Sequence, residues 1–105
     1  MNKKMHLRRA RLAWPILVNA AKRQQSITYG DLTARLGLHW RAASWFLGVI
    51  QRHCAEAELP RLQALAVNKR TRRPGAGYAG ARGPPAHLRE LDRVHAHRWD
   101  RKPPF

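Results

Sequence analysis

The feature that most constrains this chain is a short helical pattern that ends at a glycine and is followed by a second, longer pattern. Residues 28–37 read Thr-Tyr-Gly-Asp-Leu-Thr-Ala-Arg-Leu-Gly. Thr28 is a good helix N-cap, and Asp31 lies three residues later, where a capping-box partner belongs. Gly37 is typical of a helix end. With the pattern that follows, this spacing predicts a helix-turn-helix.

The longer pattern covers residues 40–57 and predicts the second helix. Its apolar residues recur at the spacing of one buried stripe: Ala43, Phe46, Leu47, Ile50 and Cys54. At 100° per residue, the opposite face holds Arg41, Trp45, Gly48 and Arg52. In a helix-turn-helix this opposite face would contact the ligand.

The charge of the chain favours an anionic partner. In 105 residues there are 21 Lys and Arg against 6 Asp and Glu, a formal net charge of +15. Within residues 1–55, ten basic side chains accompany one acid, Asp31. Such a field attracts phosphate polymers or anionic surfaces at long range. The length fits one domain with one core.

Other compositional features restrict the class of protein. No apolar stretch approaches the ~18 residues of a spanning helix, and no apolar run follows the basic N-terminus. We therefore expect a soluble cytoplasmic protein, associated with the nucleoid in a bacterium. The single cysteine excludes an internal disulfide framework. The six histidines lack zinc-ligand spacing, so neither metal nor cofactor is expected.

The rest of the chain predicts a mainly α fold with a small β-hairpin. Residues 1–12 are interpreted as a basic arm, and Pro15 as a first-turn residue of a helix that ends near Lys22 and Arg23. After Pro60, residues 65–67 predict a strand. Four of the five residues 69–73 are basic, and this turn would lead to a return strand at Gly77 and Tyr78, forming a wing.

The C-terminal part, residues 80–105, is interpreted as a linker, a last helix over 86–99 and a tail. In that helix Leu88, Leu91 and either Val94 or His95 would face inward. Residues 13–79 would then form a winged helix-turn-helix domain.

The order of these elements resembles the DNA-binding winged-helix domain of alkylguanine-DNA alkyltransferases and alkyltransferase-like proteins. The match spans roughly residues 13–79 and is carried by these segments: Ile27-Thr28-Tyr29-Gly30-Asp31-Leu32, Arg41-Ala42-Ala43, Leu59-Pro60, Ala66-Val67 and Pro74-Gly75. In that family a Tyr and an Arg act at an extruded nucleotide. The resemblance assigns these roles to Tyr29 and to Arg41, or places Ala43 at the second position if the alignment shifts by two residues.

The chain departs from this family where the family carries its alkyl acceptor. A Pro-Cys-His-Arg element is replaced here by Pro60-Arg61-Leu62-Gln63, without Cys or His. Cys54 is no substitute, because it belongs to the apolar stripe. The resemblance therefore implies a binding fold without alkyl transfer.

We expect duplex DNA to be bound through phosphates and base edges. Guanidinium groups bond both, and an indole can stack on a base. The predicted contact residues are Tyr29, His39, Trp40, Arg41, Ser44, Trp45, Arg52, Lys69, Arg70, Arg72 and Arg73.

Three other functions remain open. The first is binding of structured RNA. The second is a small metal-independent nuclease or toxin centred on His39. The third is a protein-interaction module, for example a phage or defence-system inhibitor, which would use Trp40 and Trp45 because Trp and Arg dominate interface hot spots.

Overall fold

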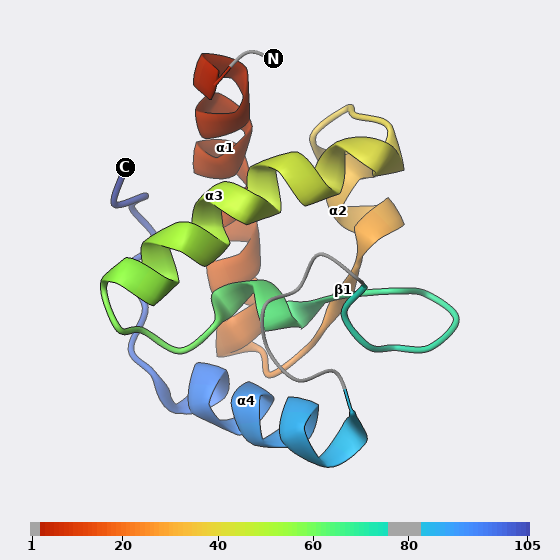
Figure 1. Cartoon of the computed structure of the whole chain (residues 1–105), viewed down its shortest axis with the longest axis vertical. Coiled ribbons are helices and arrows are strands. Elements are labelled where there is room, and N and C mark those ends of the chain that lie inside the picture. Colours follow the sequence, from red (N-terminus) through yellow and green to blue (C-terminus); the bar gives the residue numbers. More distant parts are fainter. Residues whose placement is uncertain (1–2, 76–82) are drawn as a thin grey trace.

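The computed structural model describes residues 3–75 and 83–105, and these residues form a mainly helical fold (Figure 1). Helix α3 crosses α1, and α4 lies below the C-terminal end of α1 in this view. The core lies between α1, α3 and the short 3₁₀ helix η2 (Leu62–Leu65). None of the described helices is long and apolar enough to cross a membrane.

Helix α1 (Lys3–Lys22) is the longest element and contributes a continuous buried face. This face consists of Ala10, Ala13, Trp14, Leu17, Val18 and Ala21. Two predictions are wrong here: the helix begins at Lys3 instead of following a 12-residue arm, and Pro15 lies inside it. An internal proline deprives the carbonyl of Arg11 of its helical donor and costs about 3 kcal/mol, which burial of the apolar face offsets.

Strand β1 (Ile27–Thr28) leads directly into α2 (Tyr29–Arg35). The predicted cap is confirmed, since Thr28 Oγ1 accepts a hydrogen bond from the Asp31 N–H at 3.1 Å. Gly37 ends the helix with φ +69°, and the next N–H, that of Leu38, donates to the Thr33 carbonyl at 2.9 Å. This is the Schellman geometry in which glycine is favoured.

Helix α3 (Ala43–Glu56) follows the 3₁₀ helix η1 (Trp40–Ala42). All five residues of its predicted stripe are buried, which confirms the 3.6-residue pattern. The helix ends before Pro60, because Glu58 adopts φ +55° and the Leu59 N–H donates to the Cys54 carbonyl at 2.8 Å.

The strand predicted after Pro60 is present, and among the described residues it pairs with the strand before α2. Strand β2 (Ala66–Val67) pairs in parallel with β1, Ile27 opposite Ala66 and Thr28 opposite Val67. Both strands are buried, so this pairing satisfies backbone groups on their facing edges inside the core. The predicted return strand at Gly77 and Tyr78 lies outside the described residues, and a winged fold stays a prediction.

Helix α4 (Pro84–Ala96) faces the core with part of the predicted stripe, since Val94 is buried and Leu91 packs against the core, but the prediction for Leu88 is wrong. Leu88 is 60% exposed, whereas His87, Glu90 and Val94 are buried. Polar contacts explain this orientation. His87 Nε2 lies 3.0 Å from the Ala64 carbonyl oxygen, and Glu90 accepts hydrogen bonds from Arg61, the residue before η2. Periodicity of apolar residues alone does not find such a face.

The segment after α4 is packed against α1, although a free tail was predicted. The Trp14 Nε1–H donates to the Asp100 carbonyl at 2.8 Å, and Trp99 meets Trp14 edge to face with ring centroids 5.8 Å apart. The Phe105 ring also contacts Trp14, at 5.7 Å between centroids.

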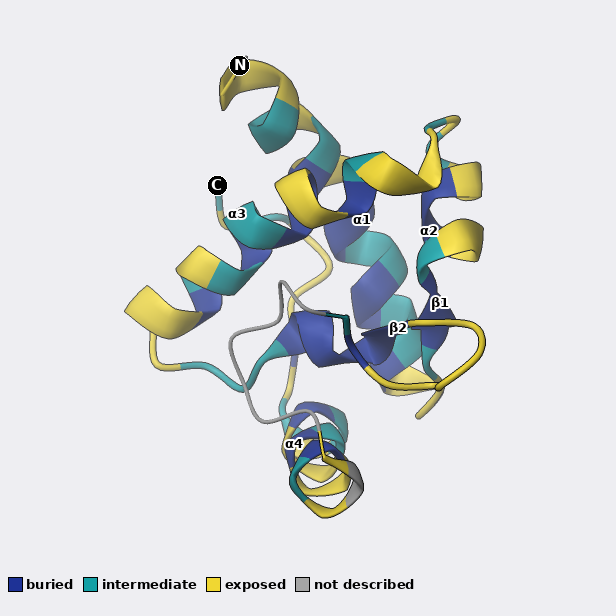
Figure 2. Ribbon diagram, turned by 45° about the vertical axis from the view of Figure 1, so that its right-hand side comes forward, coloured by how far each residue is buried: buried dark blue, intermediate teal, exposed yellow. Residues whose placement is uncertain are grey.

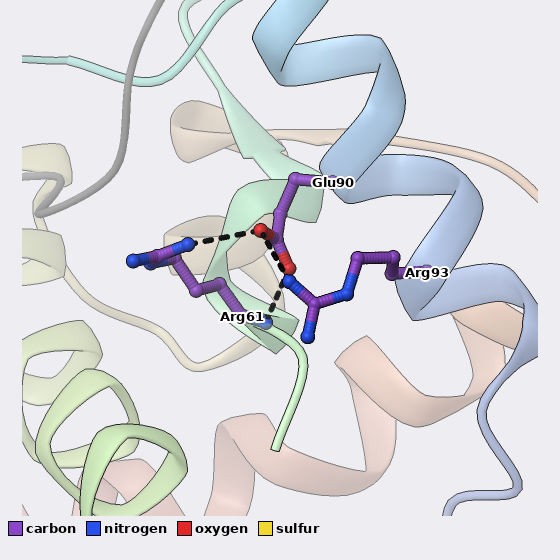
Figure 3. Close-up of polar contacts among 3 residues, drawn as sticks. All are labelled: Arg61, Glu90 and Arg93. Carbon is purple, nitrogen blue, oxygen red and sulfur yellow. Dashed lines mark hydrogen bonds and ion pairs between the residues drawn. The ribbon is translucent and has the colours of Figure 1, made fainter. Parts of the chain in front are cut away.

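The Glu90 carboxylate joins α4 to the residue before η2 (Figure 3). The Arg61 N–H donates to Glu90 Oε2 at 3.0 Å, and Arg61 Nη1 lies 2.9 Å from Oε1. Arg93 Nη1 approaches the same Oε1 at 3.5 Å. Because the carboxylate side chain is only 8% exposed, these donors replace the water it has lost.

We expect Glu90→Ala to lower the free energy of unfolding by about 1–3 kcal/mol, because it leaves the Arg61 N–H and guanidinium without their acceptor. Urea denaturation monitored by tryptophan fluorescence measures this change. Asp92→Ala removes an exposed carboxylate from the same helix and serves as the control. Equal midpoints for the two variants would contradict the anchoring role of Glu90.

Candidate nucleic-acid interface

Tyr29 connects the start of α2 to the basic segment after β2. The Thr28 cap fixes the first turn of α2, and Tyr29 is the first residue of that turn. Its Oη accepts a hydrogen bond from the Gly75 N–H at 2.6 Å. A phenolic oxygen both donates and accepts, so the Tyr29 hydroxyl hydrogen remains available to another acceptor. The bond ties residues 46 positions apart in sequence.

A cavity of about 210 Å³ opens beside Tyr29, bounded by α2, by η1 and α3, by η2 and by Gly75. Its walls are formed by Tyr29, Trp40, Arg41, Ala43, Ser44, Leu47, Gly48, Gln51, Gln63 and Gly75. Four residues predicted to contact nucleic acid are therefore brought together, namely Tyr29, Trp40, Arg41 and Ser44. No acidic residue is among these wall residues.

Gly75 is placed where a side chain would meet Tyr29. A Cβ atom built there would lie 3.5 Å from the Tyr29 Oη and 3.7 Å from its ring, at ordinary contact distance. The backbone of Gly75 therefore approaches the tyrosine directly and forms one edge of the cavity.

Aromatic and basic groups are ordered at the start of α3. His39 Nδ1 accepts a hydrogen bond from the Arg41 N–H at 3.2 Å, which caps η1. The His39 and Trp40 rings lie 5.4 Å apart, and the Arg41 guanidinium carbon lies 5.4 Å from the Trp40 ring centroid. Trp40 is 59% exposed. A guanidinium over an indole is attracted by the ring quadrupole, so Trp40 orients Arg41 at the cavity.

Only part of the predicted contact face borders the cavity. Arg41 and Gly48 line the cavity, but Trp45 and Arg52 do not. The Trp45 ring stacks on His6 of α1, with centroids 5.3 Å apart and planes 9° apart. Trp45 is nevertheless 50% exposed, and Arg52 is exposed. The role of Trp45 as a base-stacking residue stays a prediction.

The basic segment 68–73 forms a loop closed on Asn68. The Asn68 N–H donates to the Arg73 carbonyl at 2.9 Å, and the Arg72 N–H donates to the Asn68 carbonyl at 2.8 Å. Asn68 Oδ1 also accepts from the Arg70 N–H at 2.8 Å. Arg72 takes a left-handed φ of +57° to complete the turn.

The cationic side chains of this loop point away from the core. Lys69, Arg70, Arg72 and Arg73 are all exposed, and the loop stands out from the body of the protein (Figure 2). The loop starts at β2 and ends two residues before the hydrogen bond to Tyr29. Its charges are thereby held at a fixed position next to the cavity.

Six residues of the cavity wall were not among the predicted contact residues, namely Ala43, Leu47, Gly48, Gln51, Gln63 and Gly75. Gln63 is a polar residue inside an otherwise apolar run, Leu62–Val67, which is a signal the sequence does contain. Gly75 entered the sequence analysis only in the Pro74-Gly75 segment of the resemblance, because its contact with Tyr29 depends on the tertiary fold.

Metal-ligating and nucleophilic side chains also occur in residues 3–75 and 83–105. No group of three or more His, Cys, Asp or Glu there can hold a metal ion. Cys54 is fully buried on α3, and burial raises the pKa of its thiol. A raised thiol pKa disfavours the thiolate and hence nucleophilic reactivity.

Comparison with protein-family models, curated proteins and solved structures gave no match for this chain.

We expect Tyr29→Phe to release the basic loop without unfolding the protein. The Gly75 N–H loses its acceptor, so hydrogen exchange at this amide should accelerate by about fivefold, since a hydrogen bond contributes about 1 kcal/mol. Exchange measured by NMR tests this, with the Leu38 N–H as an internal reference bonded elsewhere. Unchanged exchange at Gly75 would show that the tyrosine does not hold the loop.

Proposed function

We propose that this protein binds duplex DNA without catalysing a reaction, and that its cavity receives a base extruded from a distorted or modified site. The observation that carries the proposal is the arrangement around Tyr29. One hydrogen bond joins a basic loop to the edge of a cavity whose wall also includes Trp40 and Arg41. Phosphate-binding charges and a site for a planar ring are thus adjacent.

Electrostatics supports a nucleic-acid partner. The loop supplies four exposed cations, and Arg41 of η1 and Arg52 of α3 add two more. Phosphates neutralised by such groups release counterions, which makes affinity depend steeply on salt. With roughly five to seven phosphates contacted, log K should fall with log salt at a slope of about −5 to −6.

The cavity supports the extrusion of a base. An apolar protein cavity of about 150 Å³ can hold benzene, and this cavity of about 210 Å³ is larger. Its wall includes the apolar side chains of Ala43 and Leu47 and the exposed indole of Trp40. Extruding a base costs a few kcal/mol and costs least at a mismatched or damaged position. Such sites would therefore be bound preferentially.

A protein partner is a second candidate, supported by the exposure of Trp40 at 59% and Trp45 at 50%. Structured RNA and phosphodiester cleavage at His39 are the remaining alternatives. A gel-shift panel of plain duplex, mismatched or alkylated duplex, single strand and structured RNA separates them, with incubation of plasmid and total RNA to reveal cleavage. Binding to none of these would favour the protein partner.

We expect Arg70→Ala combined with Arg72→Ala to weaken binding to all duplex sequences alike. Removing two phosphate contacts should also make the salt slope shallower by about 2. Fluorescence anisotropy at several salt concentrations measures both effects.

Arg98→Ala with Arg101→Ala is the matched control, because it removes the same charge from the segment after α4. That segment runs along the opposite side of the molecule from the basic loop (Figure 1). An unchanged slope in the loop variant, or equal changes in both variants, would remove the loop from the interface.

We expect Arg41→Ala to reduce discrimination between duplexes. The ratio of affinities for a mismatched and a fully paired duplex should fall by about 10- to 150-fold, the effect of losing one charged hydrogen bond of about 1.5–3 kcal/mol at the cavity. Arg52→Ala removes the same group outside the cavity and should weaken both duplexes equally. If both variants keep the wild-type ratio, Arg41 has no role in recognition.

A further inference from the structure

Gln63 is a buried amide without a hydrogen-bond partner among the described residues. It lies in η2 and is 4% exposed, between the fully buried Leu62 and Ala64. Neither its Nε2 nor its Oε1 is exposed to solvent or hydrogen-bonded to a described residue. Buried polar groups in native proteins are normally paired, and each unpaired one costs about 1–3 kcal/mol.

The backbone around Gln63 is held on both sides, whereas its carboxamide is not. On one side the Arg61 N–H is bonded to Glu90 (Figure 3), and on the other the Ala64 carbonyl lies 3.0 Å from His87 Nε2. Gln63 is one of the residues that line the cavity. The terminal torsion of glutamine is soft, so the carboxamide can turn toward a group placed in the cavity.

We propose that the Gln63 carboxamide reads the hydrogen-bonding edge of the base held in the cavity; this inference rests on the proposed function. A carboxamide presents a donor beside an acceptor. Its complement is a planar ring edge with adjacent acceptor and donor, as in the amino–ring-nitrogen edge or the lactam edge of a nucleobase. Rotating the carboxamide by 180° about its terminal torsion exchanges its donor and its acceptor, so it can pair with either order of these groups on the base. The Tyr29 hydroxyl hydrogen supplies a second donor in the same cavity.

The occupant is therefore a nucleobase whose polar edge is intact, and an apolar ring of the same shape is rejected. When the cavity is empty, the unpaired amide destabilises the protein. A base that pairs with the amide recovers this free energy. A good bidentate pair is worth about 1–3 kcal/mol of discrimination. This corresponds to roughly a 5- to 150-fold preference for the polar ring.

The test compares two duplexes of one sequence that differ at a single position opposite an abasic site. One carries thymine there, and the other carries difluorotoluene, an apolar ring of the same shape. Wild-type protein should bind the thymine duplex at least about fivefold more tightly. Gln63→Met should bind the two duplexes within about twofold of each other, because thioether and amide are similar in size but only the amide pairs. Gln25→Met, at an exposed position outside the cavity, should keep the wild-type ratio.

Affinity for a fully paired duplex separates this inference from the proposed function. The proposed function fails if wild-type protein binds no duplex, or if its affinity for duplexes does not fall as the salt concentration rises. If it binds duplexes but does not distinguish thymine from difluorotoluene, or if Gln63→Met retains the preference, only the role of Gln63 fails.

Thermal stability provides a second, independent readout. Because Gln63→Met removes an unpaired buried amide, the free protein should unfold at the wild-type temperature or above it. A Tm lowered by more than about 4 °C, the effect of roughly 1 kcal/mol in a domain of this size, would show that the amide supports the fold and would overturn the proposal.

Discussion

Burial of one face of α1 is the interaction on which the other elements depend. Helix α3, the 3₁₀ helix η2 and helix α4 all contact α1. Three residues of this face are alanines, Ala10, Ala13 and Ala21. Their small side chains allow close approach of the helices packed on it. This packing also explains why α1 continues through Pro15, whose intrinsic cost is small beside a buried face of six residues.

The candidate site arises where the edges of this packed core meet. Residues from α2, η1, α3 and η2 border one cavity, and the hydrogen bond from Gly75 to Tyr29 adds the end of the basic loop. The same arrangement leaves one buried amide, that of Gln63, without a partner among the described residues. A site that combines fixed backbone with uncommitted polar groups is suited to bind a ligand rather than to stabilise the fold.

Sequence patterns predicted local structure well at positions that only a few residue types can occupy favourably. Thr28 was identified as a cap and Gly37 as a helix end, since few residues serve these positions as well. The same left-handed turn also ends α1 at Gln24 and follows α3 at Glu58, each with φ +55°. Neither residue signals this conformation, so these turns could not be predicted.

Errors arose where a distant partner decides the structure. The parallel pairing of β2 with β1, 39 residues earlier, was not predicted, because it depends on how distant segments pack. Likewise the inward face of α4 is set by Glu90 and its bonds to Arg61, while Leu88 remains exposed.

The sequence by itself determined the charge, the helical stripes and the capped start of α2, because these follow from composition, periodicity and hydrogen bonds between near neighbours. Only the tertiary structure decided that Tyr29 meets Gly75, that Trp45 stacks on His6 and that Gln63 borders a cavity. Each of these contacts joins residues far apart in the chain. Their formation depends on how apolar faces pack, and local sequence does not encode that geometry.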